Sequence, residues 1–161
     1  MEYVHPYASP LGPMTMASDG VCLTGLWFDG QTHFALTLSP AHIAAELPVF
    51  DETSAWLDRY FAGDAPGKTP LLRPCGTAFQ SAVWTDLLTI PYGHTVTYGQ
   101  IAGKLRSFAR AVGGAVSRNP ISILIPCHRV VGAGGRLTGY AGGLDRKIAL
   151  LRLEGADLPG I

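Results

Sequence analysis

The chain has 161 residues, 47% of them hydrophobic and 15% charged, with a formal net charge of zero at pH 7. This composition excludes a disordered chain and predicts one domain, or two small lobes with a sizeable core. No apolar run reaches the roughly 18 residues of a membrane span, and the start, MEYVHPYASPLG, lacks the basic and apolar regions of a secretory signal.

In chain order, the first predicted elements form a small α+β unit. Short apolar runs broken by Gly and Asp-Gly over residues 10–31 predict a hairpin or meander. SAWLDRYFAG, residues 54–63, repeats apolar residues at helical spacing and stops at a glycine. The Gly- and Pro-rich residues 63–76 predict a linker. We therefore expect an N-terminal α+β supporting domain over residues 1–76 and a second domain over residues 77–161.

The second half begins with helical patterns. TAFQSAVWTDLLTI, residues 77–90, places its larger apolar residues on one helix face: Phe79, Val83, Trp84, Leu87 and Leu88. Thr97 and Gln100 have the spacing of a capping box, so a helix is expected to begin at Tyr98. Ser107 is placed to cap a further helix.

Two short helices joined by a tight turn form either a helix-turn-helix motif or an ordinary helical hairpin in the core. Arg110 lies in the first turn of the second helix and is followed by Gly113 and Gly114. Glycines inside a helix cost roughly 1 kcal/mol each relative to alanine, a cost that a close approach to another backbone would explain. That backbone belongs either to the protein or to a nucleic acid.

Charge is divided unevenly between the two halves. Residues 1–80 carry three Lys/Arg against eight Asp/Glu, whereas residues 81–161 carry nine against four. The division is either chance or the mark of a C-terminal half that meets a polyanion.

The three cysteines, Cys22, Cys75 and Cys127, are odd in number and widely spaced, with no CxxC pair. This usage predicts reduced thiols in a cytoplasmic protein rather than disulfides. We expect no metal site and no cofactor.

The stretch ISILIPCHRVV, residues 121–131, carries the most chemistry. ISILI predicts a buried strand, so Cys127 would stand at a strand end where apolar surroundings favour an inert thiol. Its neighbour His128 could instead activate it through a water, provided that a carboxylate fixes the imidazole tautomer. Glu154 ends the predicted helix LDRKIALLRL just before Gly155, a helix-ending glycine, where its charge opposes the helix dipole. It is either a tolerated surface residue or the carboxylate that binds the His128 imidazole.

Taken together, NPISILIPCHRVVGAGG, TGYAGG and LLRLEG strongly resemble the active-site region of the O6-alkylguanine-DNA alkyltransferases, the methylated-DNA–protein-cysteine methyltransferases. The likeness extends upstream through FQSAVWTDLLTIPYGHTVTYGQIA and ARAVGGA. The segment between Tyr98 and Arg110 is shorter than the usual connection in that family.

The resemblance implies a stoichiometric methylated-DNA–[protein]-cysteine S-methyltransferase that moves the alkyl group from O6-alkylguanine, and from O4-alkylthymine, to Cys127. His128 and Glu154 would form the proton relay, Asn119 would hold this network, and Tyr98 would help to protonate the departing base. Arg110 would enter the duplex through the minor groove and replace the flipped nucleotide.

The other positions that match family residues for DNA or substrate binding are Gly99, Gly113, Val130, Ala133, Tyr140, Ala141 and Lys147. Tyr140, with the loop 137–142, would wall the pocket, and Lys147 would lie behind it. The implied partner is double-stranded DNA with alkylated guanine, bound by a monomer, with cooperative binding left open and no membrane involved.

The implied fold class is α+β, with a small N-terminal α/β lobe holding a short antiparallel sheet and a mainly helical C-terminal lobe with a helix-turn-helix. Two other functions compete with repair. A lesion-binding protein without transfer would have no use for Cys127, and a Cys-His-Glu hydrolase would leave Tyr98 and Arg110 unexplained.

Overall fold

The computed structural model describes residues 1–158, which divide into two compact units. The first unit comprises Met1–Cys75 together with the short segment Pro120–Ser122. The second comprises Gly76–Asn119 and the chain from Ile123 onward. The chain therefore leaves the second unit for three residues and returns to it just before Cys127.

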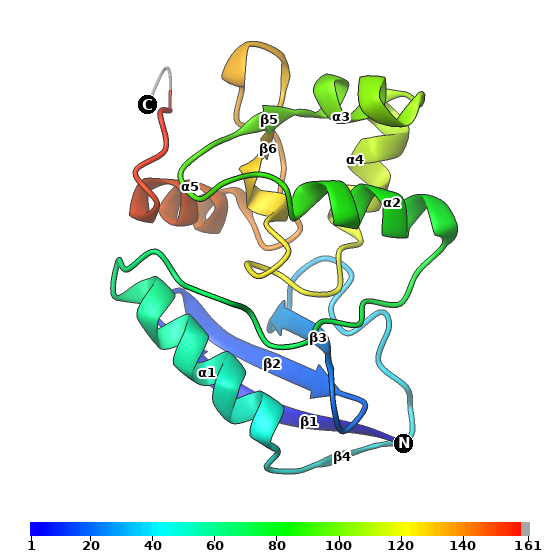
Figure 1. The fold of residues 1–161 in the computed structure, drawn as a ribbon, viewed down its shortest axis with the longest axis vertical. Helices are drawn as coiled ribbons and strands as arrows, with labels where there is room; N and C mark the ends of the chain where they lie inside the picture. Colours follow the sequence, from blue (N-terminus) through cyan, green and yellow to red (C-terminus); the bar gives the residue numbers. More distant parts are fainter. Residues whose placement is uncertain (159–161) are drawn as a thin grey trace. The chain divides into compact units, whose positions relative to one another are not determined.

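The first unit is a four-stranded sheet with one long helix (Figure 1). β2 and β3 form the hairpin that the Gly and Asp-Gly signals of residues 10–31 predicted. β1 extends it to an antiparallel meander, and β4 adds to β1 in parallel, giving the order β3-β2-β1-β4. The elements are β1 (Glu2–Ser9), β2 (Gly12–Ser18), β3 (Leu23–Phe28), β4 (His42–Ala44) and α1 (Pro48–Phe61). Pro48 favours the start of α1 because its missing N–H is not needed there.

The helix α1 packs against β1, β2 and β3. It buries a stripe of residues at helical spacing that includes Trp56, Leu57 and Tyr60. The rings of Trp56 and Tyr60 stack, with their centroids 5.5 Å apart. Met14, Met16 and Phe28 of the sheet are fully buried. This unit therefore has its own hydrophobic core.

The predicted strand over ISILI is wrong. Only Ile121 bridges to a strand, in parallel with Leu26, whose N–H donates to Pro120 O at 2.8 Å and whose carbonyl accepts from Ser122 N at 2.9 Å. Residues 122–124 then form a buried turn in which Ile123 has φ +70°. An apolar run does not by itself distinguish a strand from other buried backbone, and here the chain folds back instead of continuing along the sheet.

The second unit is mainly helical, with one two-stranded parallel sheet, β5–β6 (Figure 1). Helix α3 packs on α4, and both contact α2, which gives the predicted helix-turn-helix its support. The elements of the second unit are α2 (Ala78–Leu87), β5 (Val96–Thr97), α3 (Tyr98–Leu105), α4 (Ala109–Ser117), the 3-10 helix η1 (Cys127–Arg129), β6 (Val130–Val131), the 3-10 turn η2 (Ala133–Gly135) and α5 (Leu144–Leu153).

Capping explains where these helices begin. The capping box of Thr97 and Gln100 is present, so α3 begins at Tyr98 as predicted. A second box, between Thr77 and Gln80, begins α2.

Two local predictions in this unit are wrong. The N-cap of α4 is Phe108 rather than Ser107, and it makes no side-chain hydrogen bond, because Arg106 takes the left-handed conformation (φ +53°) and moves the helix start one residue on. Leu88 is 51% exposed although its backbone is still helical, because the buried face of α2 is limited to Val83, Trp84 and Leu87.

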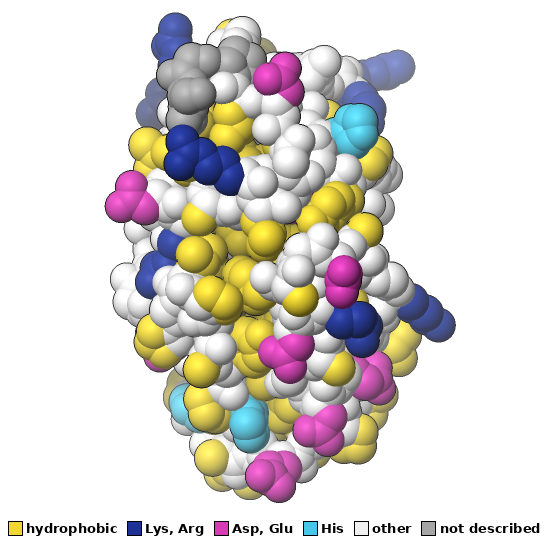
Figure 2. Space-filling model, turned by 90° about the vertical axis from the view of Figure 1, so that its left-hand side faces the viewer, with side chains coloured by type: hydrophobic (Ala, Val, Ile, Leu, Met, Phe, Trp, Pro, Cys, Tyr) yellow, Lys and Arg dark blue, Asp and Glu magenta, His cyan; other side chains and the backbone are white. Residues whose placement is uncertain are grey.

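Among residues 1–158, no helix combines the length and apolar composition needed to cross a membrane. Figure 2 shows acidic side chains spread over the N-terminal unit on the face that it presents, as the uneven charge of the sequence predicts.

Thr77→Ala is expected to lower the free energy of unfolding by about 1 kcal/mol, because the Thr77 hydroxyl accepts the Gln80 N–H at the start of α2. Urea unfolding followed by circular dichroism measures the change. Thr32→Ala, at an exposed threonine whose side chain makes no hydrogen bond within the described chain, is the matched control and should have no effect. Equal stability of the two variants would contradict the capping role.

Candidate active site

The segment Pro126–Val131 carries the candidate nucleophile and its neighbours. Cys127, His128 and Arg129 form the single turn η1, and Val130 then pairs with Val96 in the small parallel sheet. All three side chains of the turn are buried, His128 completely. The proline before the turn and the strand after it fix this backbone on both sides.

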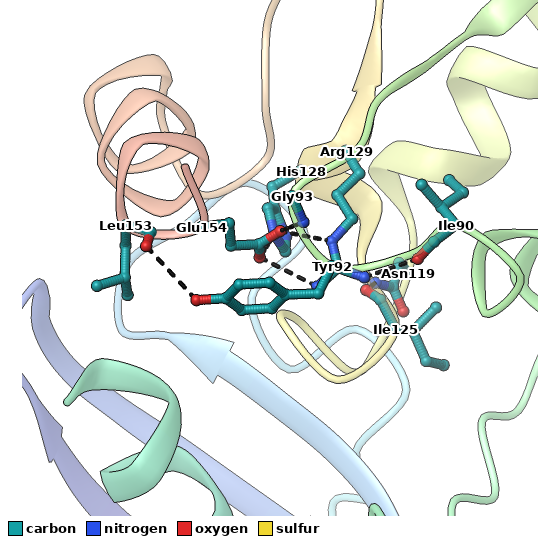
Figure 3. Close-up of polar contacts among 9 residues, drawn as sticks. All are labelled: Ile90, Tyr92, Gly93, Asn119, Ile125, His128, Arg129, Leu153 and Glu154. Carbon is teal, nitrogen blue, oxygen red and sulfur yellow. Dashed lines mark hydrogen bonds and ion pairs between the residues drawn. The ribbon is translucent and has the colours of Figure 1, made fainter. Parts of the chain in front are cut away.

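Glu154 is the hub of the polar contacts around this turn (Figure 3). It is the C-cap of α5, where Gly155 at φ +71° closes the helix end. The Ala156 N–H donates to Leu151 O and the Gly155 N–H to Arg152 O, the pair of bonds that defines a Schellman motif. The helix end therefore holds the carboxylate in one place.

Three groups donate to the Glu154 carboxylate. His128 Nε2 lies 2.6 Å from Oε2, and the Gly93 N–H donates to Oε1 at 3.1 Å. Arg129 grips both oxygens, through Nε at 2.8 Å and Nη2 at 3.1 Å. A buried carboxylate is stable only when it is paired and hydrogen-bonded in this way.

Arg129 is itself fixed from two further sides. Its Nη1 donates to Ile90 O at 2.8 Å, and its guanidinium carbon lies 5.8 Å from the centre of the Tyr92 ring, as in a cation–π contact. Tyr92 in turn reaches Leu153 O through its hydroxyl at 3.5 Å (Figure 3). Residues 90–93 therefore tie the end of α5 to the η1 turn.

The contact with Glu154 settles the tautomer of His128. A carboxylate accepts, so the neutral imidazole carries its proton on Nε2 and leaves Nδ1 as the basic nitrogen. Nδ1 is buried and has no hydrogen-bond partner among residues 1–158. Burial holds the pKa of His128 below its usual value although the Glu154 contact raises it, so the ring is neutral at pH 7.

The thiol of Cys127 is protonated at neutral pH, because burial raises its pKa. Four groups oppose this shift: hydrogen bonding from the Asn119 side chain, the Tyr140 side chain, the charge of Lys147 and the backbone of Cys127 itself. Asn119 Nδ2 also donates to Ile125 O at 2.8 Å, which closes the buried turn onto the site. The surroundings thus disfavour a thiolate at rest but contain groups that would stabilise one.

Lys147 projects from α5 into the interior and is fully buried. Its Nζ donates to Val130 O at 2.6 Å and to Thr138 O at 3.3 Å, and lies 6.0 Å from the centre of the Tyr98 ring. Burial lowers the pKa of Lys147 to about 8, and the neighbouring Cys127 acts in the opposite direction. The lysine therefore ties the loop containing Thr138 to the η1 turn and brings a positive charge near the sulfur.

Tyr98, the first residue of α3, completes the group around Cys127. Burial raises the pKa of its hydroxyl, the Thr138 side chain lowers it, and negative charge on Cys127 raises it. A Cβ added to Gly113 would lie 3.9 Å from the Tyr98 ring, so α4 passes this tyrosine with its small-residue face.

The remaining predicted residues lie outside this buried group. Arg110 is exposed on α4, and Gly99 and Ala133 are exposed as well. Ala141 is half-buried. Val130, by contrast, is buried within the group, and its carbonyl accepts from Lys147 at 2.6 Å. Residues 1–158 contain no group of three or more His, Cys, Asp or Glu side chains placed to hold a metal ion.

Three residues of this site had no predicted role: Arg129, Tyr92 and Gly93. Arg129 follows His128 directly, and an arginine after a buried apolar run signals a buried partner carboxylate, since buried charges are paired. Tyr92 and Gly93 carried no such signal, because their contacts with Leu153 and Glu154 join segments far apart in the chain.

Comparison with known families gives two adjacent matches. Residues 3–67 match the family model described as 6-O-methylguanine DNA methyltransferase, ribonuclease-like domain. Residues 78–156 match the model described as 6-O-methylguanine DNA methyltransferase, DNA binding domain. The resemblance inferred from the sequence motifs is thereby confirmed.

Individual relatives agree with the family models. The chain is 49% identical over 150 residues to a methylated-DNA–protein-cysteine methyltransferase of Mycobacterium leprae, with 91% of this chain and 88% of that protein covered. It is 45% identical to a protein of the same name from Methanosarcina acetivorans, covering 96% and 99%. The crystal structure of Mycobacterium tuberculosis OGT in complex with DNA matches with a TM-score of 0.85 and 44% identity, covering 95% of this chain and 92% of that one.

Arg129→Ala is expected to lower the free energy of unfolding by about 3–5 kcal/mol, because it leaves the buried Glu154 carboxylate without its two guanidinium bonds. Urea unfolding at pH 7 measures the loss. Arg152→Ala, at an exposed arginine in the last turn of α5, is the matched control and should change stability by less than about 0.5 kcal/mol. If both variants lower the free energy of unfolding by the same small amount, Arg129 does not stabilise the buried carboxylate.

Proposed function

The chain belongs to the 6-O-methylguanine DNA methyltransferase family, and on this basis we propose that it repairs DNA by moving the alkyl group from O6-alkylguanine to its own Cys127. O4-alkylthymine is proposed as a second substrate. The observation that carries the proposal is the buried His128–Glu154 contact of 2.6 Å beside a buried thiol. Because Glu154 occupies Nε2 of His128, the basic nitrogen Nδ1 remains available in the residue next to the proposed acceptor, Cys127.

The chemistry follows from the protonation states. Cys127 gives its proton to His128 Nδ1, through a bridging water, and Glu154 stabilises the imidazolium that results. The sulfur then attacks the alkyl carbon, a C–S bond forms, and the carbon–O6 bond breaks in line with it. The guanine leaves with the electron pair of that bond and takes up a proton, for which Tyr98 is the proposed donor.

The other buried groups support this transfer. Asn119, Tyr140 and Lys147 each lower the pKa of Cys127 against the effect of burial, so they favour the thiolate when the proton moves. The Val130 carbonyl is proposed to accept a hydrogen bond from the guanine amino group, and Ala141 to present its amide near O6. The thioether that forms has no good leaving group, so each molecule should act once.

The duplex must deliver the base to a buried sulfur, so the nucleotide has to leave the helix, at a cost of a few kcal/mol. Arg110 is proposed to enter the minor groove and fill the place of the flipped nucleotide, with Gly99, Gly113 and Ala133 close to the DNA. The exposure of Arg110 and the small side chains on its helix face support this assignment.

The domain roles are part of the proposal. Residues 77–161 would bind DNA and accept the alkyl group, and residues 1–76 would support them. The cytoplasm is the proposed location, because the reaction consumes a reduced thiol and all three cysteines within the described chain are free.

Incubation with a duplex that carries a single O6-methylguanine should add one methyl group per protein, and peptide mapping should place it on Cys127. Intact-mass spectrometry measures the gain, and Cys127→Ser should show none, whereas Cys75→Ser, at an exposed thiol, should react like the wild type. Binding without any mass gain would favour a lesion-binding protein, and repeated turnover of an ester would favour a hydrolase.

The transfer rate should not rise with pH between about 6.5 and 8, and toward the upper end it should begin to fall as Lys147, whose pKa is about 8, loses the charge that favours the thiolate. The pKa of His128 lies below its ordinary 6.5 and that of Cys127 above its ordinary 9.0, so the pair holds one proton throughout this range. Moving that proton from sulfur to nitrogen does not change the number of protons bound. Below the range the imidazole becomes protonated and the rate should fall.

Single-turnover reaction with free O6-benzylguanine over this range measures the profile. A small free thiol under the same conditions is the reference, and its alkylation should rise about tenfold per pH unit below its pKa. The same slope for the protein would mean that Cys127 ionises independently of His128.

A further inference from the structure

We propose that Phe108 is an apolar wedge that stacks its ring on the bases of the duplex beside the nucleotide flipped out, next to Arg110. This inference rests on the proposed function, because it requires that α4 approaches DNA. It assigns to the α3–α4 turn a contact with the bases of the duplex.

The first support is exposure. Phe108 is 79% exposed, more than any other large hydrophobic residue among residues 1–158. A single exposed apolar residue is ordinary on a protein surface, so exposure alone decides nothing. An exposed phenylalanine in the segment that must meet a ligand has a stronger claim, since apolar wedges are a recurrent means of opening base steps from the minor groove.

The second support is position. Phe108 is the N-cap of α4, and Arg110 follows two residues later, so their Cα atoms lie no more than ~7 Å apart. Neither side chain has a hydrogen bond or ion pair within the described part of the chain. Any approach that brings Arg110 into the minor groove therefore brings the backbone of Phe108 to within a few base pairs of it.

The third support is charge. Residues 98–118 contain four basic residues and no acidic one. Arg106 and Arg110, which flank Phe108, are exposed and have no ion pair within residues 1–158, whereas Lys104 is paired with Asp86 at 3.0 Å. Cations on both sides of an aromatic ring suit a polyanion whose bases stack, and this fits a duplex better than an apolar protein partner.

The fourth support is rigidity. The turn has only three residues between the two helices, Arg106–Phe108. Arg106 takes the left-handed conformation at φ +53°, and the N–H groups of Arg106 and Ser107 both donate to Ala102 O. The ring is therefore presented from a fixed backbone, which lowers the entropic cost of inserting it.

Phe108→Ala should weaken binding to a duplex with one O6-methylguanine about tenfold, the usual size of a lost base–aromatic stack, and slow transfer from subsaturating duplex to the same extent. Reaction with free O6-benzylguanine should keep the wild-type rate. The slope of log Kd against log salt concentration should also stay the same, since no phosphate contact is lost, whereas Arg106→Ala should reduce it. Leu88→Ala, at another exposed apolar residue of the second unit, is the matched control and should behave as the wild type.

Phe108→Trp provides a direct readout. Trp27, Trp56 and Trp84 are all buried, so an added indole at position 108 is the one that acrylamide quenches readily. When the protein binds duplex, the fluorescence of this indole should fall, because stacking on bases quenches it. The fluorescence that remains should be shielded from quenching by acrylamide. Leu88→Trp should show neither effect.

Wild-type affinity of Phe108→Ala for duplex would overturn the proposal, as would shielding of Trp at position 108 without loss of emission. Failure of the wild type to take a methyl group from the duplex would instead overturn the proposed function. The two failures are therefore distinguishable.

Discussion

The hydrogen bonds and the ion pair that hold the buried Glu154 carboxylate are the constraint on which the rest of the site depends. Arg129, His128 and the Gly93 backbone all donate to this one group, so the end of α5, the η1 turn and the loop at residues 90–93 are held together. A buried carboxylate without these donors would cost several kcal/mol. The three sets of contacts with Glu154 therefore form together or not at all, and they leave the His128 imidazole with one orientation and one tautomer.

Burial of the thiol serves the proposed chemistry in two ways. A raised pKa keeps Cys127 protonated, so it is poorly reactive toward small electrophiles and oxidants, which attack the thiolate. The same dry surroundings strengthen each interaction with the charge that appears during transfer, including those of Asn119 and Lys147. The inert buried thiol and the nucleophile, which the sequence left as alternatives, are thus two protonation states of one site.

Local signals in the sequence predicted the parts of this fold that depend on local interactions. The capping pair Thr97–Gln100 and the glycine at position 155 placed the ends of α3 and α5 correctly, because both act within one helical turn. The position of Glu154 against the helix dipole made it a candidate, but it left a tolerated surface residue equally open, and the family resemblance was needed to assign its role. Lys147 buried against Val130 O, and Tyr92 under Arg129, were beyond such reasoning, since each joins segments distant in sequence.

The wrong strand over ISILI shows why the turn matters. Along a strand, successive side chains point to opposite faces, so Cys127 and Arg129 would share one face and His128 would take the other. In the 3-10 turn, with three residues per turn, successive side chains are about 120° apart and point in three directions. The thiol can then meet Asn119 while the imidazole and guanidinium both reach Glu154.

The chain folds back before η1, in the turn at residues 122–124. Ile123 there has φ +70°, a costly conformation for a β-branched residue. The 3-10 turn therefore lets one short segment supply the proposed acceptor, its proposed base and the cation that binds the carboxylate.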